Sequence, residues 1–189
     1  MGRPGLRESR LIMAAKAVFL DRDGVLTRAV IRQGIPFAPV SLEEMEILPG
    51  AVEAVESLRK AGFLTIVVTN QPDVARGKMK REAVEAMHKK LRGLLALNDI
   101  FVCCHDDGDG CKCRKPQPGM LNDAAERFGI DLSASFLIGD RWKDAAAGKA
   151  AGCASIWIDF GYDEPPAEAA DFIVSSLGEA VAVILKNPR

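Results

Sequence analysis

Two aspartates separated by one residue follow a short apolar run near the N-terminus. The run spans residues 17–20, and Asp21, Asp23 and Gly24 come directly after it. Consecutive apolar residues of this kind suit a strand that is buried on both faces of a parallel sheet. Two carboxylates just beyond such a strand repel one another unless a cation or a shared proton stabilises them. The spacing therefore predicts either a cation site or a plain Asp–Gly turn, which is a common motif.

Two later apolar runs also end in polar residues. The carboxyl ends of parallel strands meet at one edge of an open α/β sheet, where such sheets bind ligands. We therefore expect the polar residues to gather at that edge with the two aspartates. These residues are Thr69, Asn70 and Gln71 after residues 63–68, and Asp140 after residues 136–139.

Together these residues have the chemistry of phosphoryl transfer with a divalent cation. Mg²⁺ binds a few carboxylates, with water and phosphate oxygens completing its octahedron, and Asp21 and Asp140 can supply such ligands. A carboxylate can attack phosphorus and become an aspartyl phosphate. A second acid must protonate the leaving oxygen and later activate water, which suits Asp23. The charge of the transition state needs surrounding donors. The candidate phosphate-binding residues are Thr69, Asn70, Gln71 and Lys115.

Simpler interpretations exist for three of the charged residues. Asp140 and Asp144 stand where an Ala-rich helix is expected to begin, so each could serve only as an N-terminal cap. Lys115 could be a solvated surface charge. The sequence alone leaves these alternatives open.

Three cysteines and a histidine lie within eleven residues of one another. They form a C-x-H…C-x-C set made of Cys103, His105, Cys111 and Cys113. Three thiolates and one imidazole suit a tetrahedral, structural Zn²⁺ site without an open position. The alternative is a group of reduced thiols without a metal, and Cys104 is a neighbouring thiol that could compete as a ligand. This cysteine usage indicates a reducing, cytoplasmic location rather than a disulfide framework.

Apolar runs alternate with segments of helical periodicity along the rest of the chain. This alternation predicts an α/β fold with a doubly wound, Rossmann-like parallel sheet and helices on both faces. The connection at 27–49 contains several Gly and Pro residues and is expected to be mostly loop, with one helical turn near Ser41. Strands are expected at 17–20, 63–68, 100–102, 136–139, 155–158 and 171–174, and helices at 51–61, 80–97, 118–128, 144–151 and after 176.

Length and composition describe a globular chain with one domain. We expect residues 1–16 to be an N-terminal arm, disordered or an extension, and residues 17–189 to be a single domain with the cysteine–histidine loop at 103–113. The formal net charge is −1, which gives no support to a nucleic-acid or membrane partner. We expect a monomer that acts on a small molecule.

The ordered motifs resemble those of the haloacid dehalogenase superfamily of phosphatases. They are Asp21-Arg-Asp-Gly-Val, Thr69-Asn70-Gln71, Lys115 and Gly139-Asp140 with Asp144. The resemblance implies that Asp21 is the nucleophile and Asp23 the acid and base. It also implies that Mg²⁺ is bound by the Asp21 carboxylate, the Asp23 backbone carbonyl and Asp140. Asp144 would then hold either the outer ligands of the metal or a neighbouring lysine.

The cysteine–histidine loop narrows the resemblance to a subgroup without a large cap domain. That subgroup includes heptose bisphosphate phosphatases and histidinol-phosphate phosphatases, and the segments 69–77 and 113–120 resemble its members. It implies a phosphorylated sugar as substrate, with the 7-phosphate of a heptose 1,7-bisphosphate preferred and histidinol phosphate as the alternative. Arg114 is expected to bind the second phosphate or the sugar, since a guanidinium binds phosphate bidentately. An inactive, zinc-stabilised binding module is the alternative from another functional class.

Overall fold

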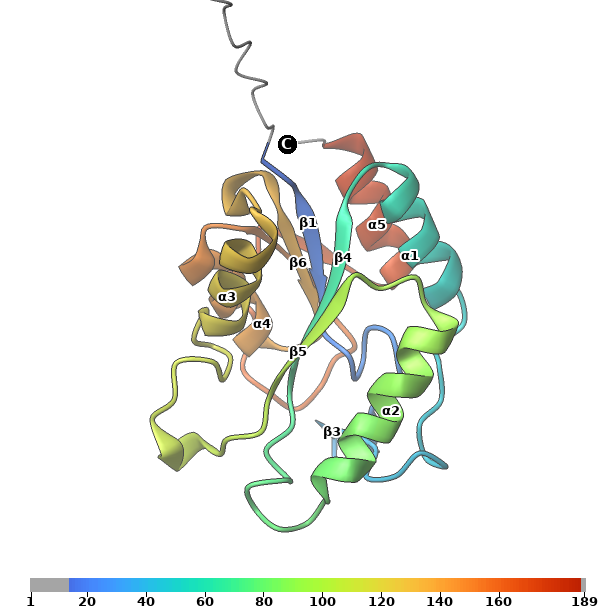
Figure 1. Ribbon diagram of the computed structural model, residues 1–189, viewed down its shortest axis with the longest axis vertical. Coiled ribbons are helices and arrows are strands. Elements are labelled where there is room, and N and C mark those ends of the chain that lie inside the picture. The colour runs from blue at the N-terminus through green and yellow to red at the C-terminus, as the bar shows by residue number, and fades with distance from the viewer. Residues whose placement is uncertain (1–13, 188–189) are drawn as a thin grey trace, which may run out of the picture.

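Six parallel strands form one open sheet in the order β5-β4-β1-β6-β7-β8 (Figure 1). The computed structural model describes residues 14–187, so the predicted arm at 1–16 lies almost entirely outside the described residues. The strand order doubles back at β1, which confirms the predicted doubly wound topology. The strands are β1 (Ala17–Leu20), β4 (Leu64–Asn70), β5 (Asp99–Cys103), β6 (Phe136–Gly139), β7 (Ala154–Ile158) and β8 (Phe172–Val174).

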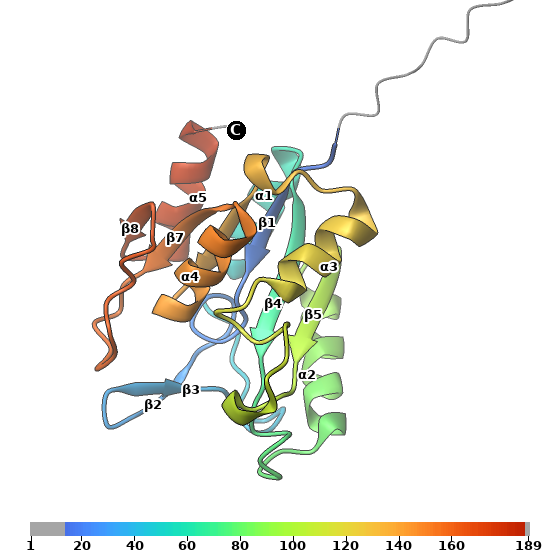
Figure 2. The same ribbon diagram turned by 90° about the vertical axis from the view of Figure 1, so that its left-hand side faces the viewer.

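Five helices cover the two faces of this sheet (Figures 1 and 2). One face carries α1 (Ala51–Lys60), α2 (Arg81–Leu94) and α5 (Leu177–Lys186), and the other carries α3 (Gly119–Phe128) and α4 (Trp142–Ala151). Two short 3-10 helices, η1 (Asp107–Asp109) and η2 (Leu132–Ala134), lie in the connections. No helix among residues 14–187 is long and apolar enough to cross a membrane.

The central strand β1 is buried because both of its faces are covered. Successive side chains of a strand point to opposite faces, and here Val18 and Leu20 pack into one apolar core while Ala17 and Phe19 pack into the other. All four side chains are fully buried. The Asp21 backbone N–H donates to the Ile138 carbonyl at 2.9 Å, which continues the alignment of β1 with β6 for one more residue. Asp21 is thereby placed just beyond the sheet edge.

A two-stranded hairpin lies between β1 and α1, where the sequence predicted mostly loop. Strands β2 (Val30–Arg32) and β3 (Ile35–Phe37) pair antiparallel across Gln33 and Gly34, so the loop prediction was wrong here. Both turn residues have positive φ, 51° and 77°, as a type I′ hairpin turn requires. Such turns usually carry Asn-Gly or Asp-Gly, and Gln in the first position hid the turn. The described segment between β1 and α1 contains only this hairpin as regular structure, so no large cap domain is present there.

Candidate active site

Lys115 lies between two carboxylates at the carboxyl end of the sheet. Its Nζ is 2.9 Å from Asp21 Oδ1 and 2.5 Å from Asp144 Oδ1, and it donates to the Val68 carbonyl at 2.8 Å. All three charged side chains are buried. Although burial alone would lower it, the two carboxylates raise the pKa of Lys115 above its ordinary value. The lysine is therefore a fixed positive charge and not a surface residue.

The amide of Asn70 holds the backbone of Lys115 in place. Its Nδ2 donates to the Lys115 carbonyl at 3.0 Å, and its Oδ1 accepts from the Lys115 N–H at 3.1 Å. Asn70 is the last residue of β4, so this pair of bonds ties the lysine loop to the sheet. The expected phosphate contact of Asn70 stays a prediction, because here its amide serves to position Lys115.

Asp140 presents two buried carboxylate oxygens without a hydrogen bond of ordinary geometry among the described residues. One ligand oxygen each from Asp21, Asp140 and Asp144 lie within 4.8 Å of one another. Burial, with Asp21 and Asp144 nearby, raises the pKa of Asp140 well above its ordinary value. Burial also raises the pKa of Asp21 to about 6, although Lys115 opposes this shift. Clustered buried carboxylates fit a hard divalent cation such as Mg²⁺.

Two glycines make room for these carboxylates. A Cβ on Gly24 would collide with the Asp140 carboxylate, and a Cβ on Gly139 would collide with that of Asp144. Gly24 also has φ +95°, a conformation that side chains rarely adopt. The predicted sharp turn after Asp23 is therefore present, and it doubles as the space that Asp140 occupies.

Three side chains hold the Asp23 carboxylate in place beside Asp21. Thr27 Oγ1 donates to Oδ1 at 2.8 Å, Gln71 Nε2 donates to Oδ2 at 2.9 Å, and Arg22 Nε lies 3.0 Å from Oδ1. Gln71 also donates to Thr69 Oγ1 at 2.8 Å. The expected phosphate contact of Gln71 stays a prediction, because in the structure its amide positions Asp23.

Sequence reasoning missed the buried pair formed by Arg22 and His88. Arg22 is fully buried behind Asp23, and its Nη1 lies 3.3 Å from His88 Nε2 on α2. Burial, followed by the positive charge of Arg22, lowers the pKa of His88 to about 4. A neutral His88 can accept from the guanidinium, and the pair connects α2 to the Asp23 loop. A single arginine between two aspartates gives no indication of the direction in which its side chain folds.

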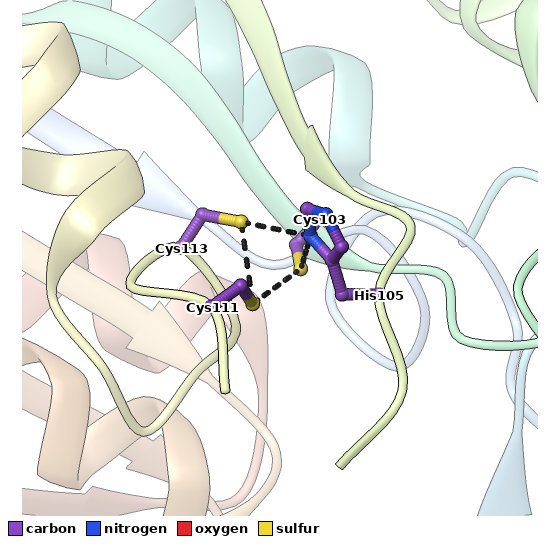
Figure 3. A group of neighbouring side chains, drawn as sticks. All are labelled: Cys103, His105, Cys111 and Cys113. Atoms are coloured by element: carbon purple, nitrogen blue, oxygen red, sulfur yellow. Dashed lines mark hydrogen bonds between the residues drawn. The ribbon is translucent and has the colours of Figure 1, made fainter. Parts of the chain in front are cut away.

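The cysteine–histidine set forms a compact cluster at the end of β5 (Figure 3). Cys103 Sγ is 3.5 Å from His105 Nδ1 and 3.7 Å from Cys111 Sγ. Cys113 Sγ is 3.3 Å from His105 Nδ1 and 3.6 Å from Cys111 Sγ. A tetrahedron with Zn–S bonds of about 2.3 Å has edges of about 3.8 Å, which matches these separations. Burial raises the pKa of the Cys103 thiol, and a zinc ion would reverse that shift. The four side chains therefore fit a structural zinc ion.

Two adjoining cavities open above Asp21. The inner one, of about 60 Å³, is lined by Asp21, Asp23, Thr69 and Lys115 among others. The outer one, of about 210 Å³, is lined by four cationic side chains, and both share residues 36–38 of the hairpin. The cationic side chains are Arg76, Arg114, Arg141 and Lys143. The arrangement can hold one anionic group beside Asp21 and a second one farther out.

A model of the haloacid dehalogenase-like hydrolases matches residues 36–152, more than half of the chain. The chain belongs to this family. This hydrolase is 37% identical over 154 residues to a D-glycero-beta-D-manno-heptose-1,7-bisphosphate 7-phosphatase of Pseudomonas aeruginosa, covering 79% of this chain and 84% of the relative. It is 33% identical over 188 residues to the enzyme of that name from Escherichia coli K12, covering 92% and 95%.

A solved structure supports the same assignment of this hydrolase. The D,D-heptose 1,7-bisphosphate phosphatase of Bordetella bronchiseptica, crystallised with magnesium and phosphate, superposes with a TM-score of 0.77 at 32% identity. The match covers 90% of this chain and 98% of that one. The family and fold predicted from the motifs are therefore confirmed.

The structure brings the predicted site residues of this hydrolase into two groups. The first surrounds Asp21 at the sheet edge, and the second is the cysteine–histidine cluster. Arg114 lies between them and lines the outer cavity. Cys104 lies outside the cysteine–histidine cluster, which consists of the four residues that the sequence predicted.

Proposed function

We propose that this chain is a Mg²⁺-dependent phosphatase that removes the 7-phosphate of D-glycero-D-manno-heptose 1,7-bisphosphate through an aspartyl phosphate. The observation that carries the proposal is the buried group of Asp21, Lys115 and Asp144 beside the buried carboxylate of Asp140. The names and the coverage of the relatives support the substrate. Bound Mg²⁺ would be held by Asp21 and Asp140 with the Asp23 carbonyl, and it would offset the repulsion between carboxylate and phosphate.

Asp21 is the nucleophile in this proposal. Its Oδ1 accepts from the Arg22 N–H at 2.8 Å and contacts Lys115, which fixes the plane of the carboxylate. No hydrogen bond holds Oδ2 among residues 14–187, so Oδ2 is the oxygen that attacks phosphorus. Lys115 keeps Asp21 ionised and stabilises the charge that spreads over the phosphoryl oxygens.

Asp23 acts on the leaving oxygen and then on water. In its protonated form Asp23 gives its proton to the sugar oxygen as the P–O bond breaks, and the resulting carboxylate then takes a proton from the water that attacks the aspartyl phosphate. Thr27 and Gln71 hold both of its oxygens at the cavity wall. Arg114 in the outer cavity binds the second phosphate. Cys103, His105, Cys111 and Cys113 would hold a zinc ion, which would fix the loop from which Arg114 extends.

A panel of phosphomonoesters tests the proposed function. The full chain, with Mg²⁺ present, is assayed for phosphate release from heptose 1,7-bisphosphate, heptose 7-phosphate and histidinol phosphate. We expect the highest kcat/KM for the bisphosphate, and no turnover by Asp21→Asn. Preference for histidinol phosphate would contradict the proposed substrate, and a failure to release phosphate from any compound would favour the inactive binding module.

We also propose that residues 17–189 act as a single domain, as a monomer in the cytoplasm.

A further inference from the structure

The outer cavity is rich in cations that are already paired with acidic residues of the same chain. Arg76 Nη2 lies 2.6 Å from Asp106 Oδ1, and Arg141 forms an ion pair with Glu164. Asp106 belongs to the loop between the cysteine–histidine ligands, and Glu164 to the segment after β7. The cavity therefore carries its own counter-charges around a space that a substrate would enter.

One carboxylate oxygen of Asp107 is shared by two of these cations. Its Oδ1 lies 2.7 Å from Arg114 Nε and 3.7 Å from Lys143 Nζ. Asp107 is the first residue of η1, and its side chain is 65% exposed. A carboxylate so exposed can turn into solvent without disturbing the core. The Asp107 carboxylate therefore occupies an anion position between Arg114 and Lys143 and is free to leave it.

Arg114 has a donor that no group of the described chain uses. The residue is only 9% exposed, and its Nη1 is buried without a hydrogen-bond partner. A buried guanidinium donor without a partner is costly. Nη1 lies on the other edge of the planar guanidinium, so one anion cannot bind it together with Nε. Asp107 offers Nε and Lys143 a single oxygen. A phosphate with three terminal oxygens can accept from the Nε–Nη2 edge bidentately and reach Lys143 as well.

We propose that Asp107 is a specificity-determining residue that occupies the subsite of the substrate's distal anionic group and is displaced when that group binds. The inference rests on the proposed function, since it presumes a substrate with two phosphates. Displacement exchanges one carboxylate for a dianionic phosphate with more acceptors. A hydroxyl or a neutral group at the same position leaves Asp107 in place, so the residue weakens the binding of bisphosphates and leaves the binding of monophosphates unchanged.

The test compares KM for heptose 1,7-bisphosphate and heptose 7-phosphate in Asp107 variants of the full chain. Because an ion pair near the surface contributes up to about 1 kcal/mol, Asp107→Asn is expected to lower KM for the bisphosphate about fivefold. KM for the monophosphate should not change. Asp107→Glu keeps the carboxylate and should behave as the natural chain. Asp123→Asn removes the same charge from an exposed position of α3 and should have no effect.

Three results would overturn the inference: an unchanged KM, a raised KM for the bisphosphate, or an equal fall for both substrates. A raised KM would mean that Asp107 orients Arg114 for binding. The proposed function fails separately, if the natural chain does not hydrolyse the heptose compound. In that case fructose 1,6-bisphosphate and fructose 6-phosphate replace the heptose pair, and the same KM comparison applies. If the chain accepts no bisphosphate, the role of Asp107 is refuted.

Discussion

Lys115 Nζ lies 2.5 Å from Asp144 Oδ1, and both side chains are almost completely buried. The lysine is the positive charge that balances Asp21 and Asp144. Removing one partner of a buried ion pair destabilises a protein by about 3–5 kcal/mol, because it leaves an uncompensated charge. The pair therefore links the stability of the fold to the electrostatics of the site.

Lys115→Met should lower the free energy of unfolding by about 3 kcal/mol in the absence of Mg²⁺. The remaining carboxylates then repel one another, and added Mg²⁺ should restore much of the loss. Urea unfolding with and without Mg²⁺ measures both effects. The matched control is Lys149→Met, which removes a lysine from the exposed side of α4. Equal stability of the two variants without Mg²⁺ would show that Lys115 does not balance the cluster.

Gly24→Ala should abolish Mg²⁺ binding while the protein stays folded. The added methyl group would occupy the space of the Asp140 carboxylate, which must then leave the cluster. Gly62→Ala is the matched control, since Gly62 has a similar φ of +86° but nothing within 4 Å of its Cβ position. Both variants should lose about 1 kcal/mol from backbone strain. Calorimetric titration with Mg²⁺ separates them, and full binding by Gly24→Ala would refute the close approach.

His88 should make the stability of the chain depend on pH. Its pKa is about 4 in the folded protein, against an ordinary value of 6.5. The folded state therefore binds fewer protons than the unfolded state between these values. The stability that His88 contributes is complete above its unfolded pKa and is lost as the pH falls toward its folded pKa.

Comparison with His88→Gln isolates this contribution, because Gln can still accept from Arg22 but does not titrate. Between about pH 7.5 and about pH 5, the natural chain should lose about 2 kcal/mol relative to the variant. Denaturant unfolding of both proteins at the two pH values gives the difference directly. A constant difference would mean that His88 titrates normally, with its ring accessible to water.

Zinc removal should destabilise the loop that carries Arg114. Metal analysis is expected to find about one zinc ion per chain. Cys113→Ser should lower both the zinc content and Tm. Cys104 follows Cys103 in the chain but lies outside the cluster, so Cys104→Ser should change neither quantity. A folded natural chain that contains no zinc after purification in metal-replete buffer would contradict the zinc site.

The sequence was sufficient to predict which residues meet at the sheet edge. Asp21, Thr69 and Asp140 each follow an apolar run, and parallel strands bring such positions together whatever the helices do. The spacing of the cysteine–histidine set was equally informative, because its ligands lie close together along the chain. The first prediction depends on the topology of the sheet, and the second depends on residue type and spacing along the chain.

The direction of individual side chains was not predictable. The expected phosphate contacts of Asn70 and Gln71 stay predictions, but no motif indicated that their amides would also bind the Lys115 backbone and Asp23. Arg22 folds back into the core toward His88, which lies 66 residues later in the chain. Such contacts depend on tertiary packing, which short motifs do not encode. The β2–β3 hairpin was missed for a local reason, since Gln33 rarely adopts a positive φ.

Chemical trapping of the phosphorylated enzyme tests the central proposal most directly. The natural chain is mixed with heptose 1,7-bisphosphate and Mg²⁺, quenched during turnover, and reduced with borohydride, which converts an aspartyl phosphate to homoserine. Peptide mass spectrometry should then find homoserine at position 21, and Asp21→Asn should show none. Homoserine at another aspartate, or none while phosphate is being released, would contradict the assignment of Asp21 as the nucleophile.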